Sequence, residues 1–329
     1  MIGAARLLIM MIRPPVAVVL MLFASIGLAL GGRANGFHPL LTSVFLIVGG
    51  WFIHATVLND LADEEIDRVN LRDARGRPLV SGDATRAQLM VLGLSCGAVA
   101  LVASWLVNWR VGAVVSVGLV LNAAYSLKPL QLSHRGMLAV ALLPLGYVAL
   151  PFLVGVFSAK AVLEADDMVV LVGLYVTFMG RIVLKDFRDE GGDRLFGKRT
   201  FLIRHGREQT AMFSAACWIV GSATLIAVVP PQSVLFADFV AYLVCVLHGL
   251  FLLVRTDGHT AQQVVIGAVA QAGRGMGLNL LAHFIMMAER WSRTDQALVH
   301  LSVVAVFVYM YIEMVARRET TAPAAIRPF

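Results

Sequence analysis

Apolar residues along this chain are gathered into long runs, and most charged residues fall in the segments between them. A helix needs about 17–25 consecutive, mainly apolar residues to cross a bilayer. Ten runs reach or approach this length, and they lie near residues 15–31, 39–58, 88–107, 110–126, 137–157, 168–184, 211–230, 234–254, 263–288 and 298–316. The pattern predicts an all-α integral membrane protein with nine or ten transmembrane helices.

The run at 263–288 is the least apolar of these segments. Polar side chains inside a membrane usually face other helices or a water-filled cavity, because they are costly to expose to lipid. We therefore expect this helix to be turned away from lipid along the face that carries its polar residues, which are Gln263, Gln271, Arg274, Asn279 and His283.

Composition supports the same class of protein. Hydrophobic residues make up 59% of the 329 residues and charged residues only 15%. A soluble chain of this length has no core large enough for so much apolar material.

Arginine and lysine are distributed unevenly over the loops. The basic residues of the loops at 59–87 and 185–210 are Arg68, Arg72, Arg75, Arg77, Arg86, Lys185, Arg188, Arg194, Lys198, Arg199, Arg204 and Arg207. The alternate loops at 32–38, 108–109, 158–167 and 231–233 hold only Arg33 and Lys160. Because short cytoplasmic loops retain positive charge, both basic loops are predicted to be cytoplasmic. This topology accounts for the net charge of +6, so a nucleic-acid partner is not expected.

Two acidic triplets with the same spacing each follow directly after an apolar run. They are Asp60, Asp63 and Asp67 in NDLADEEID, and Asp186, Asp189 and Asp193 in KDFRDEGGD. On a helix, positions 0, 3 and 7 lie within roughly 60° of one another, so each triplet can aim three carboxylates at one point. A single triplet is typical of a solvated helix face. Two triplets at one spacing, on one predicted side of the membrane, favour a shared function.

The chemistry of these side chains indicates a metal and a diphosphate. Mg²⁺ prefers hard oxygen ligands and binds through one or two carboxylates together with the phosphates of a substrate. An aqueous nucleotide would not need a site among many apolar helices, so the rest of the substrate is expected to be lipid. An isoprenyl diphosphate meets both demands. A cation-coupled carrier is disfavoured, since the acids lie at helix ends and not at the bilayer midplane.

At these residues the sequence resembles the UbiA-type intramembrane prenyltransferases. Asn59, Asp60, Asp63 and Asp67 match the family's NDxxDxxxD motif, and the second triplet matches its DxxDxxxD motif. Further resemblances are Arg13-Pro14 near the first helix, Arg68 and Asn70, Arg77-Pro78-Leu79 to Gly82, the YSLKPL element from Tyr125 to Leu130, and Gly197, Thr200 and Gly206.

The resemblance runs over roughly residues 10–255. The family usually has nine spans, so the apolar segment at 298–316 is a departure from its pattern. The resemblance implies helices arranged around a central, lipid-accessible cavity with cytoplasmic cap loops. It also implies a single domain over residues 1–316, followed by a short tail at 317–329 that we expect to be disordered.

The activity implied is Mg²⁺-dependent transfer of an isoprenyl chain from a polyprenyl diphosphate to a lipophilic acceptor. The YSLKPL and RPLVSG elements look more like the branches that use aromatic acceptors, phenolic or quinone-precursor rings. The alternative is an intramembrane terpene cyclase, in which the substrate's own double bonds take the place of the acceptor. No obligate protein partner is expected.

The resemblance also implies roles for single residues. Two Mg²⁺ ions would be held by Asp60, Asp63, Asp67, Asp186, Asp189 and Asp193. Asn59, Arg77, Lys128 and Lys185 would bind the diphosphate, and Asn59, Tyr125, Lys128 and Lys185 would act in catalysis. Simpler readings remain open: Lys185 can enforce topology, Lys128 can reach lipid headgroups, and Tyr125 can anchor the helix at the interface.

The basic residues also favour one kind of cell. Arginine outnumbers lysine 23 to 4, which hints at a GC-rich bacterial genome. The expected location is therefore a bacterial inner membrane, with the acidic triplets toward the cytoplasm.

Overall fold

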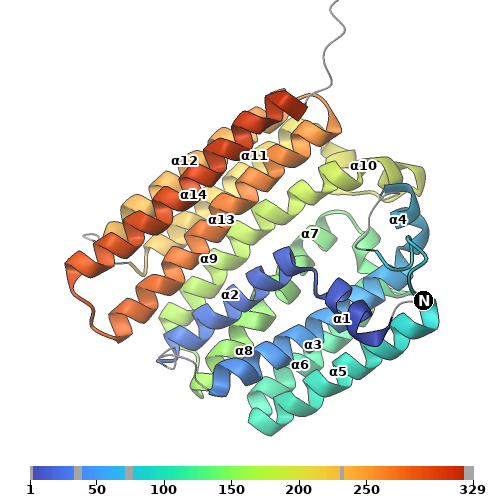
Figure 1. Cartoon of the computed structure of the whole chain (residues 1–329), viewed down its shortest axis with the longest axis horizontal. Coiled ribbons are helices and arrows are strands. Elements are labelled where there is room, and N and C mark those ends of the chain that lie inside the picture. The colour runs from blue at the N-terminus through green and yellow to red at the C-terminus, as the bar shows by residue number, and fades with distance from the viewer. Residues whose placement is uncertain (1–2, 33–38, 71–76, 230–232, 322–329) are drawn as a thin grey trace, which may run out of the picture. The chain divides into compact units, whose positions relative to one another are not determined.

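A computed structural model describes residues 3–32, 39–70, 77–229 and 233–321, and the described residues form helices and turns without any strand (Figure 1). The helices are α1 (Ala4–Ile12), α2 (Pro14–Leu30), α3 (Pro39–Ala62), α4 (Glu64–Asn70), α5 (Arg86–Val107), α6 (Trp109–Ser126), α7 (Met137–Pro144), α8 (Leu150–Ala159), α9 (Ala165–Ile182), α10 (Asp186–Leu195), α11 (Phe201–Ile226), α12 (Val234–Arg255), α13 (His259–Ala288) and α14 (Arg293–Thr321). Three short helical turns, Leu132–His134, Leu145–Ala149 and Val183–Lys185, complete the order of elements.

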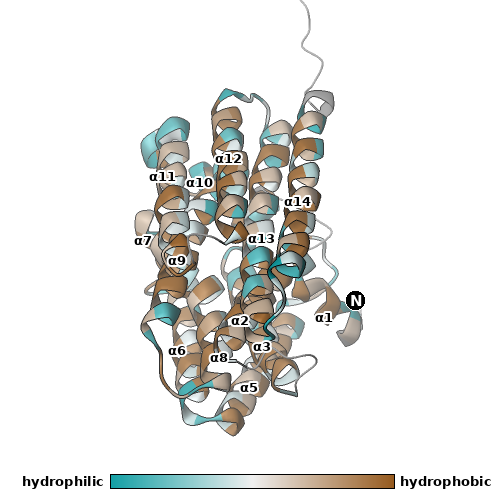
Figure 2. Ribbon diagram, turned by 90° about the vertical axis from the view of Figure 1, so that its left-hand side faces the viewer, coloured by the Kyte–Doolittle hydropathy of each residue, from teal (hydrophilic) through white to brown (hydrophobic). Residues whose placement is uncertain are grey.

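Among the described residues, eight helical segments are long and apolar enough to cross a membrane. They are α3, α5, α7 with α8, α9 with α10, α11, α12, α13 and α14. A ninth is obtained if α1 and α2, which are bent by 68° at their junction, are counted as one span. In Figure 2 the long helices are mostly brown, and teal residues gather toward their ends and in the loops. An all-α protein with about nine spans is therefore confirmed.

Every expected apolar run coincides with a helix, but the upper expectation of ten spans is not reached. The helix at the expected run 110–126 is α6, which has only 18 residues and is absent from the set above. This helix contains Arg110, Asn122 and Tyr125, and these polar side chains lower its mean hydropathy. At the C-terminus α14 continues to Thr321, so residues 317–321 of the expected tail are helical. The remaining tail residues, 322–329, lie outside the described part, as do Arg33, Arg72 and Arg75 of the expected loops.

The chain forms two compact units. The first comprises Met1–Asp167 and Glu190–Thr200, and the second comprises Met168–Asp189 and Phe201–Phe329. In the first unit, α2 and α8 approach closely because small residues face each other. A Cβ added to Gly27 would lie 2.2 Å from the carbonyl oxygen of Phe152, and one added to Gly155 would lie 2.1 Å from that of Ala24. Small residues of this kind let helix backbones meet inside a membrane.

The contact between α3 and α5 also belongs to the first unit. It supports α3, the helix whose last turn holds the first residue of the first acidic triplet. His54 Nδ1 lies 3.0 Å from the carbonyl oxygen of Gly93, and the same glycine packs against Val57. His54 is therefore a packed, hydrogen-bonded histidine in this helix contact. Trp51 and Phe52 continue the buried face of α3 into the apolar core of this unit.

The second unit contains a group of buried polar residues from three helices, which we call the histidine cluster: Asp238 on α12, Asn279 and His283 on α13, and His300 on α14. His300 Nδ1 lies 3.0 Å from Asp238 Oδ2, and Asn279 Nδ2 donates to the same oxygen at 3.0 Å. The rings of His283 and His300 are 5.7 Å apart. Asn279 and His283 were expected to face other helices, and both are buried.

Candidate active site

The first acidic triplet lies where the long helix α3 gives way to the short helix α4. Asp60 is in the last turn of α3, Asp63 lies at the break, and Asp67 is in α4. Helical hydrogen bonds continue across the break, from Asp63 N to Asn59 O at 2.9 Å and from Asp67 N to Asp63 O at 2.8 Å. The three carboxylates therefore stay on successive helical turns, as their spacing predicts. All three residues are buried, with exposed fractions of 3%, 7% and 8%.

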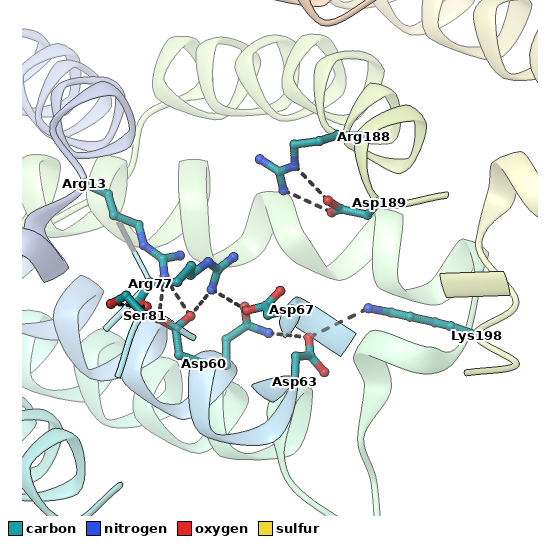
Figure 3. Close-up of polar contacts among 10 residues, drawn as sticks. Arg13, Asp60, Asp63, Asp67, Arg77, Ser81, Arg188, Asp189 and Lys198 are labelled. Carbon is teal, nitrogen blue, oxygen red and sulfur yellow. Dashed lines mark hydrogen bonds and ion pairs between the residues drawn. The ribbon is translucent and has the colours of Figure 1, made fainter. Parts of the chain in front are cut away.

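Two arginines meet the carboxylate of Asp60 (Figure 3). Arg13 Nη2 donates to both carboxylate oxygens, at 2.7 and 2.5 Å. Arg77 Nη1 also donates to Asp60, and it forms an ion pair with Asp67 Oδ2 at 2.9 Å. One guanidinium group thus bridges two members of the triplet. Burying a carboxylate is costly unless a cation accompanies it, and these arginines supply the required charge.

Asp63 is surrounded by a different set of groups. Asn59 Nδ2 donates to its Oδ2 at 3.0 Å, and Lys198 Nζ lies 3.8 Å from the same oxygen. His134 Nε2 lies 3.6 Å from Oδ1. We use the name acidic site for Asp60, Asp63 and Asp67 together with Arg13, Arg77 and Lys198.

Local ion pairs hold α4 against the segment that carries Arg77. Glu64 pairs with Arg68 at 2.9 Å and with Arg86, and Arg68 Nη2 also donates to the carbonyl oxygen of Leu79 at 3.4 Å. The hydrogen bond from Arg68, aided by Arg86, holds the pKa of Glu64 below its ordinary value. The loop that brings Arg77 to the triplet is therefore fastened to α4 itself.

The second acidic triplet lies on the single helix α10, so its 0, 3, 7 spacing is also realised as helical turns. Asp186 and Asp193 are buried, with exposed fractions of 3% and 2%. Asp189 is less buried and pairs with the neighbouring Arg188, through Nε at 2.7 Å and Nη2 at 3.0 Å. Lys198 Nζ lies 3.6 Å from Asp193 Oδ1.

The residues expected from the sequence differ in how they are placed. Asn59 and Arg77 contact the first triplet directly. Tyr125 is half-buried in the last turn of α6, and Lys128 is exposed in the loop that follows. Lys185 is half-buried at the end of the turn Val183–Lys185, directly before α10.

Comparison with known proteins decides the family. A family model described as the UbiA prenyltransferase family matches residues 18–265, a range that includes both acidic triplets. The chain belongs to this family. The resemblance inferred from the motifs is thereby confirmed.

The names of the curated relatives refer to chemically different substrates and products. The chain is 30% identical to the bacteriochlorophyll synthase 33 kDa chain of Cereibacter sphaeroides, over 52% of this chain and 55% of that protein. It is 27% identical to the homogentisate phytyltransferase of Synechocystis, over 54% of this chain and 62% of that protein. The digeranylgeranylglyceryl phosphate synthase of Archaeoglobus fulgidus is 26% identical over 60% of this chain and 63% of its own length. The chain thus spans less than two thirds of each of these relatives.

Solved structures share the UbiA fold. A structure of a digeranylgeranylglyceryl phosphate synthase has a TM-score of 0.63 at 18% identity, covering 87% of this chain and 99% of that one. A UbiA homolog from Archaeoglobus fulgidus bound to DMAPP and Mg²⁺ has a TM-score of 0.58 at 14% identity, covering 94% of this chain and 99% of that one. These likenesses confirm the fold class.

The donor set of the UbiA acidic site suits Mg²⁺. In the described part of the chain, no three His, Cys, Asp or Glu side chains converge in a metal-binding arrangement. The carboxylates are hard oxygen donors, and the bridge from Arg77 to Asp60 and Asp67 shows that a cation is stable between two of them. That all six aspartates of the two triplets hold metal stays a prediction from the sequence.

Three of the residues near the first triplet were not predicted from the sequence to belong to this site. Arg13 was noted only as part of an Arg-Pro pair, Lys198 only as a loop charge, and His134 was not noted. A signal existed for Arg13, because a charge between two apolar runs needs a counter-ion. Lys198 follows Gly197, which comes four residues after Asp193, and a glycine just beyond a helix is typical of a helix cap.

Proposed function

We propose that this protein transfers an isoprenyl chain from an isoprenyl diphosphate to a lipophilic, aromatic acceptor in a Mg²⁺-dependent reaction. One observation carries the proposal: three carboxylates, Asp60, Asp63 and Asp67, are buried together at the end of an apolar helix and are balanced by cations. Hard oxygens and basic side chains in one place are what a metal–diphosphate pair requires. The DMAPP and Mg²⁺ bound to the Archaeoglobus fulgidus homolog support the same chemistry here.

In this reaction the allylic C–O bond breaks and both bonding electrons leave with the diphosphate. The acceptor then forms the new bond to the allylic carbon and gives up a proton. Two Mg²⁺ ions, when bound by the two triplets, would stabilise the charge that develops on the leaving diphosphate. Asn59 orients the Asp63 carboxylate through their hydrogen bond.

The basic and aromatic residues have complementary roles in the proposal. Arg77, Lys128 and Lys185 neutralise the diphosphate, and Asn59 donates to a phosphate oxygen. Tyr125, at the end of α6, donates a hydrogen bond to the diphosphate or shields the allylic carbocation that forms when the C–O bond breaks. These assignments extend the family resemblance to this chain residue by residue.

The proposed acceptor is a ring, not a glycerol phosphate. The name homogentisate phytyltransferase refers to a phenolic acceptor and supports this class. The glycerol-phosphate class is represented by other relatives and forms the competing outcome of an acceptor screen. We place the reaction at the cytoplasmic face of a bacterial inner membrane, because the loops around both triplets are rich in arginine and lysine.

The test uses the full-length protein in lipid nanodiscs with Mg²⁺ and geranyl, farnesyl or geranylgeranyl diphosphate. Diphosphate release and organic-soluble products are followed by mass spectrometry, first alone and then with phenolic acceptors. Release that depends on the phenolic acceptor supports the proposal. A hydrocarbon or terpene alcohol formed without acceptor would instead identify a terpene cyclase, and no release under any condition would reject both activities.

A further inference from the structure

A glycine-based cap ends α10 and sets the path of the chain after the second acidic triplet. Gly197 has a φ of +68°, a conformation that glycine adopts without steric cost. Gly197 N donates to Arg194 O at 3.2 Å and Lys198 N donates to Asp193 O at 2.8 Å. This pair of bonds is the Schellman motif, which closes the helix and turns the chain back along its last turn. The cap therefore fixes the backbone of Lys198 beside Asp193.

The side chain of Lys198 is directed into the acidic site, not toward solvent. Only 11% of it is exposed, although lysine side chains normally extend into water. Its Nζ lies 3.8 Å from Asp63 Oδ2 and 3.6 Å from Asp193 Oδ1. One ammonium group thus lies between the first triplet and the last member of the second triplet, all within the first unit.

The distances distinguish Lys198 from the arginines of the same site. An N–H···O hydrogen bond has a donor–acceptor distance of about 2.7–3.2 Å, and both Lys198 contacts are longer. Arg13, by contrast, forms two close bonds to Asp60. An ammonium has three donors, so Lys198 is attracted by two carboxylates without being committed to either of them.

We propose that Lys198 is a further diphosphate-binding residue, a role that rests on the proposed function. The argument is one of charge. Divalent cations at Asp63 and Asp193 would neutralise both partners of the ammonium and repel it. The diphosphate is then the remaining anion of high charge at this position, and the lysine donates to its oxygens. The helix cap keeps Lys198 in place for this exchange of partners.

The test measures ligand binding directly. Inorganic diphosphate with Mg²⁺ is titrated into the full-length protein in nanodiscs by calorimetry, and Mn²⁺ binding without diphosphate is measured by electron paramagnetic resonance. Lys198→Met is expected to weaken diphosphate binding by about 10- to 100-fold, the range of a charged hydrogen bond. Mn²⁺ binding is expected to remain as strong or to become stronger, because a competing cation is removed. Lys198→Arg is expected to restore most of the diphosphate affinity.

Arg194→Met is the matched control, because it removes one positive charge four residues away, in the last turn of α10, at a side chain that is 61% exposed and pairs with Glu190. It should bind diphosphate like the wild type. If Lys198→Met fails to fold, Lys198→Gln takes its place. Unchanged diphosphate affinity in a folded Lys198 variant overturns the inference, as does a parallel loss of Mn²⁺ binding, which would mean a structural role. If the wild type turns over isoprenyl diphosphates and the Lys198 variant binds diphosphate normally, the role of Lys198 is rejected and the proposed function is not.

Discussion

Asp60 and Asp238 are equally deep in their own units, with exposed fractions of 3% and 2%, but they are neutralised in different ways. Asp60 lies at the end of α3 and is met by Arg13 and Arg77, two long side chains that come from outside that helix. Asp238 lies within the span α12, and its partners His300 and Asn279 are on the neighbouring spans α14 and α13. The first carboxylate has permanently charged partners, and the second has an imidazole and an amide.

The difference teaches that burial alone does not identify a reactive carboxylate. Partners on long side chains can be exchanged for a metal ion and a diphosphate, so the acidic site is suited to binding. Partners fixed on three packed helices hold those helices together, so the histidine cluster is suited to stability. We therefore expect changes at the two places to affect different properties.

Removal of divalent metal is expected to have the largest effect. EDTA should reduce diphosphate release to background, because the carboxylates of the acidic site cannot stabilise a negatively charged leaving group without a cation. Mg²⁺ or Mn²⁺ in excess should restore turnover. The measurement is diphosphate release by the full-length protein before and after chelation. Full activity in EDTA would show that the chemistry assigned to the acidic site is wrong.

Asp60→Asn comes next, with an expected fall in turnover of more than about 100-fold, comparable to the removal of one electrostatic group from an active site. The fold should persist with some loss of stability, because the amide keeps the shape of the side chain and Arg77 retains Asp67 as a partner, whereas Arg13 loses the charge of Asp60. Turnover and thermal unfolding are measured together in detergent. Asp166→Asn is the control, since this carboxylate is exposed in the first turn of α9. If Asp60→Asn retained its turnover, the expectation that Asp60 serves activity and Asp238 serves stability would be wrong for Asp60.

These two experiments test residues whose role was predicted from the sequence. The triplets could be predicted because residues three and four apart lie on one helix face whatever the rest of the fold does. The spans could be predicted for the same local reason, although the run at 110–126, which was expected to span, forms α6 and is not among the candidate spans. The pairing of Arg13 with Asp60 could not be found this way. Arg13 lies 47 positions from Asp60, and only folding brings them together.

In the histidine cluster, too, the sequence predicted that some residues are buried but not which residues are their partners. Asn279 and His283 were expected to face other helices because they interrupt an apolar run, and they do. Asp238 gave no such signal, since one acidic residue in an otherwise apolar segment does not reveal which helix supplies its partner. His300 lies 62 positions further along, on a helix whose apolar pattern predicts only that it spans.

Asp238→Asn is expected to act on stability. The change leaves His300 beside a neutral amide in a buried position, which should lower the free energy of unfolding by about 1–3 kcal/mol. Turnover per folded molecule should stay at the wild-type level. Thermal unfolding in detergent gives the first quantity and the diphosphate assay gives the second. Asp257→Asn, at an exposed position two residues after the end of α12, serves as the control. If turnover were lost while thermal unfolding stayed normal, Asp238 would be a functional residue, and the two buried carboxylates would no longer differ in role.

The smallest effect is expected at Glu64, which neighbours the acidic site but pairs with exposed arginines. Arg68 and Arg86 have exposed side-chain fractions of 54% and 63%, so solvent screens both pairs. Glu64→Gln should lower the free energy of unfolding by less than about 1 kcal/mol. Because the pKa of Glu64 is held below its ordinary value of 4.5, its contribution is present above pH 4.5 and is lost as the pH falls through the lower folded value.

The difference in unfolding temperature between wild type and Glu64→Gln should therefore be constant near neutral pH and should shrink below about pH 4.5. Glu65→Gln, at the exposed neighbouring position, is the control for the loss of one negative charge from α4. Turnover at neutral pH should change little in either variant. If Glu64→Gln instead abolishes turnover without affecting unfolding, the ion pairs around α4 do more than hold the Arg77 loop, and the acidic site extends to Glu64.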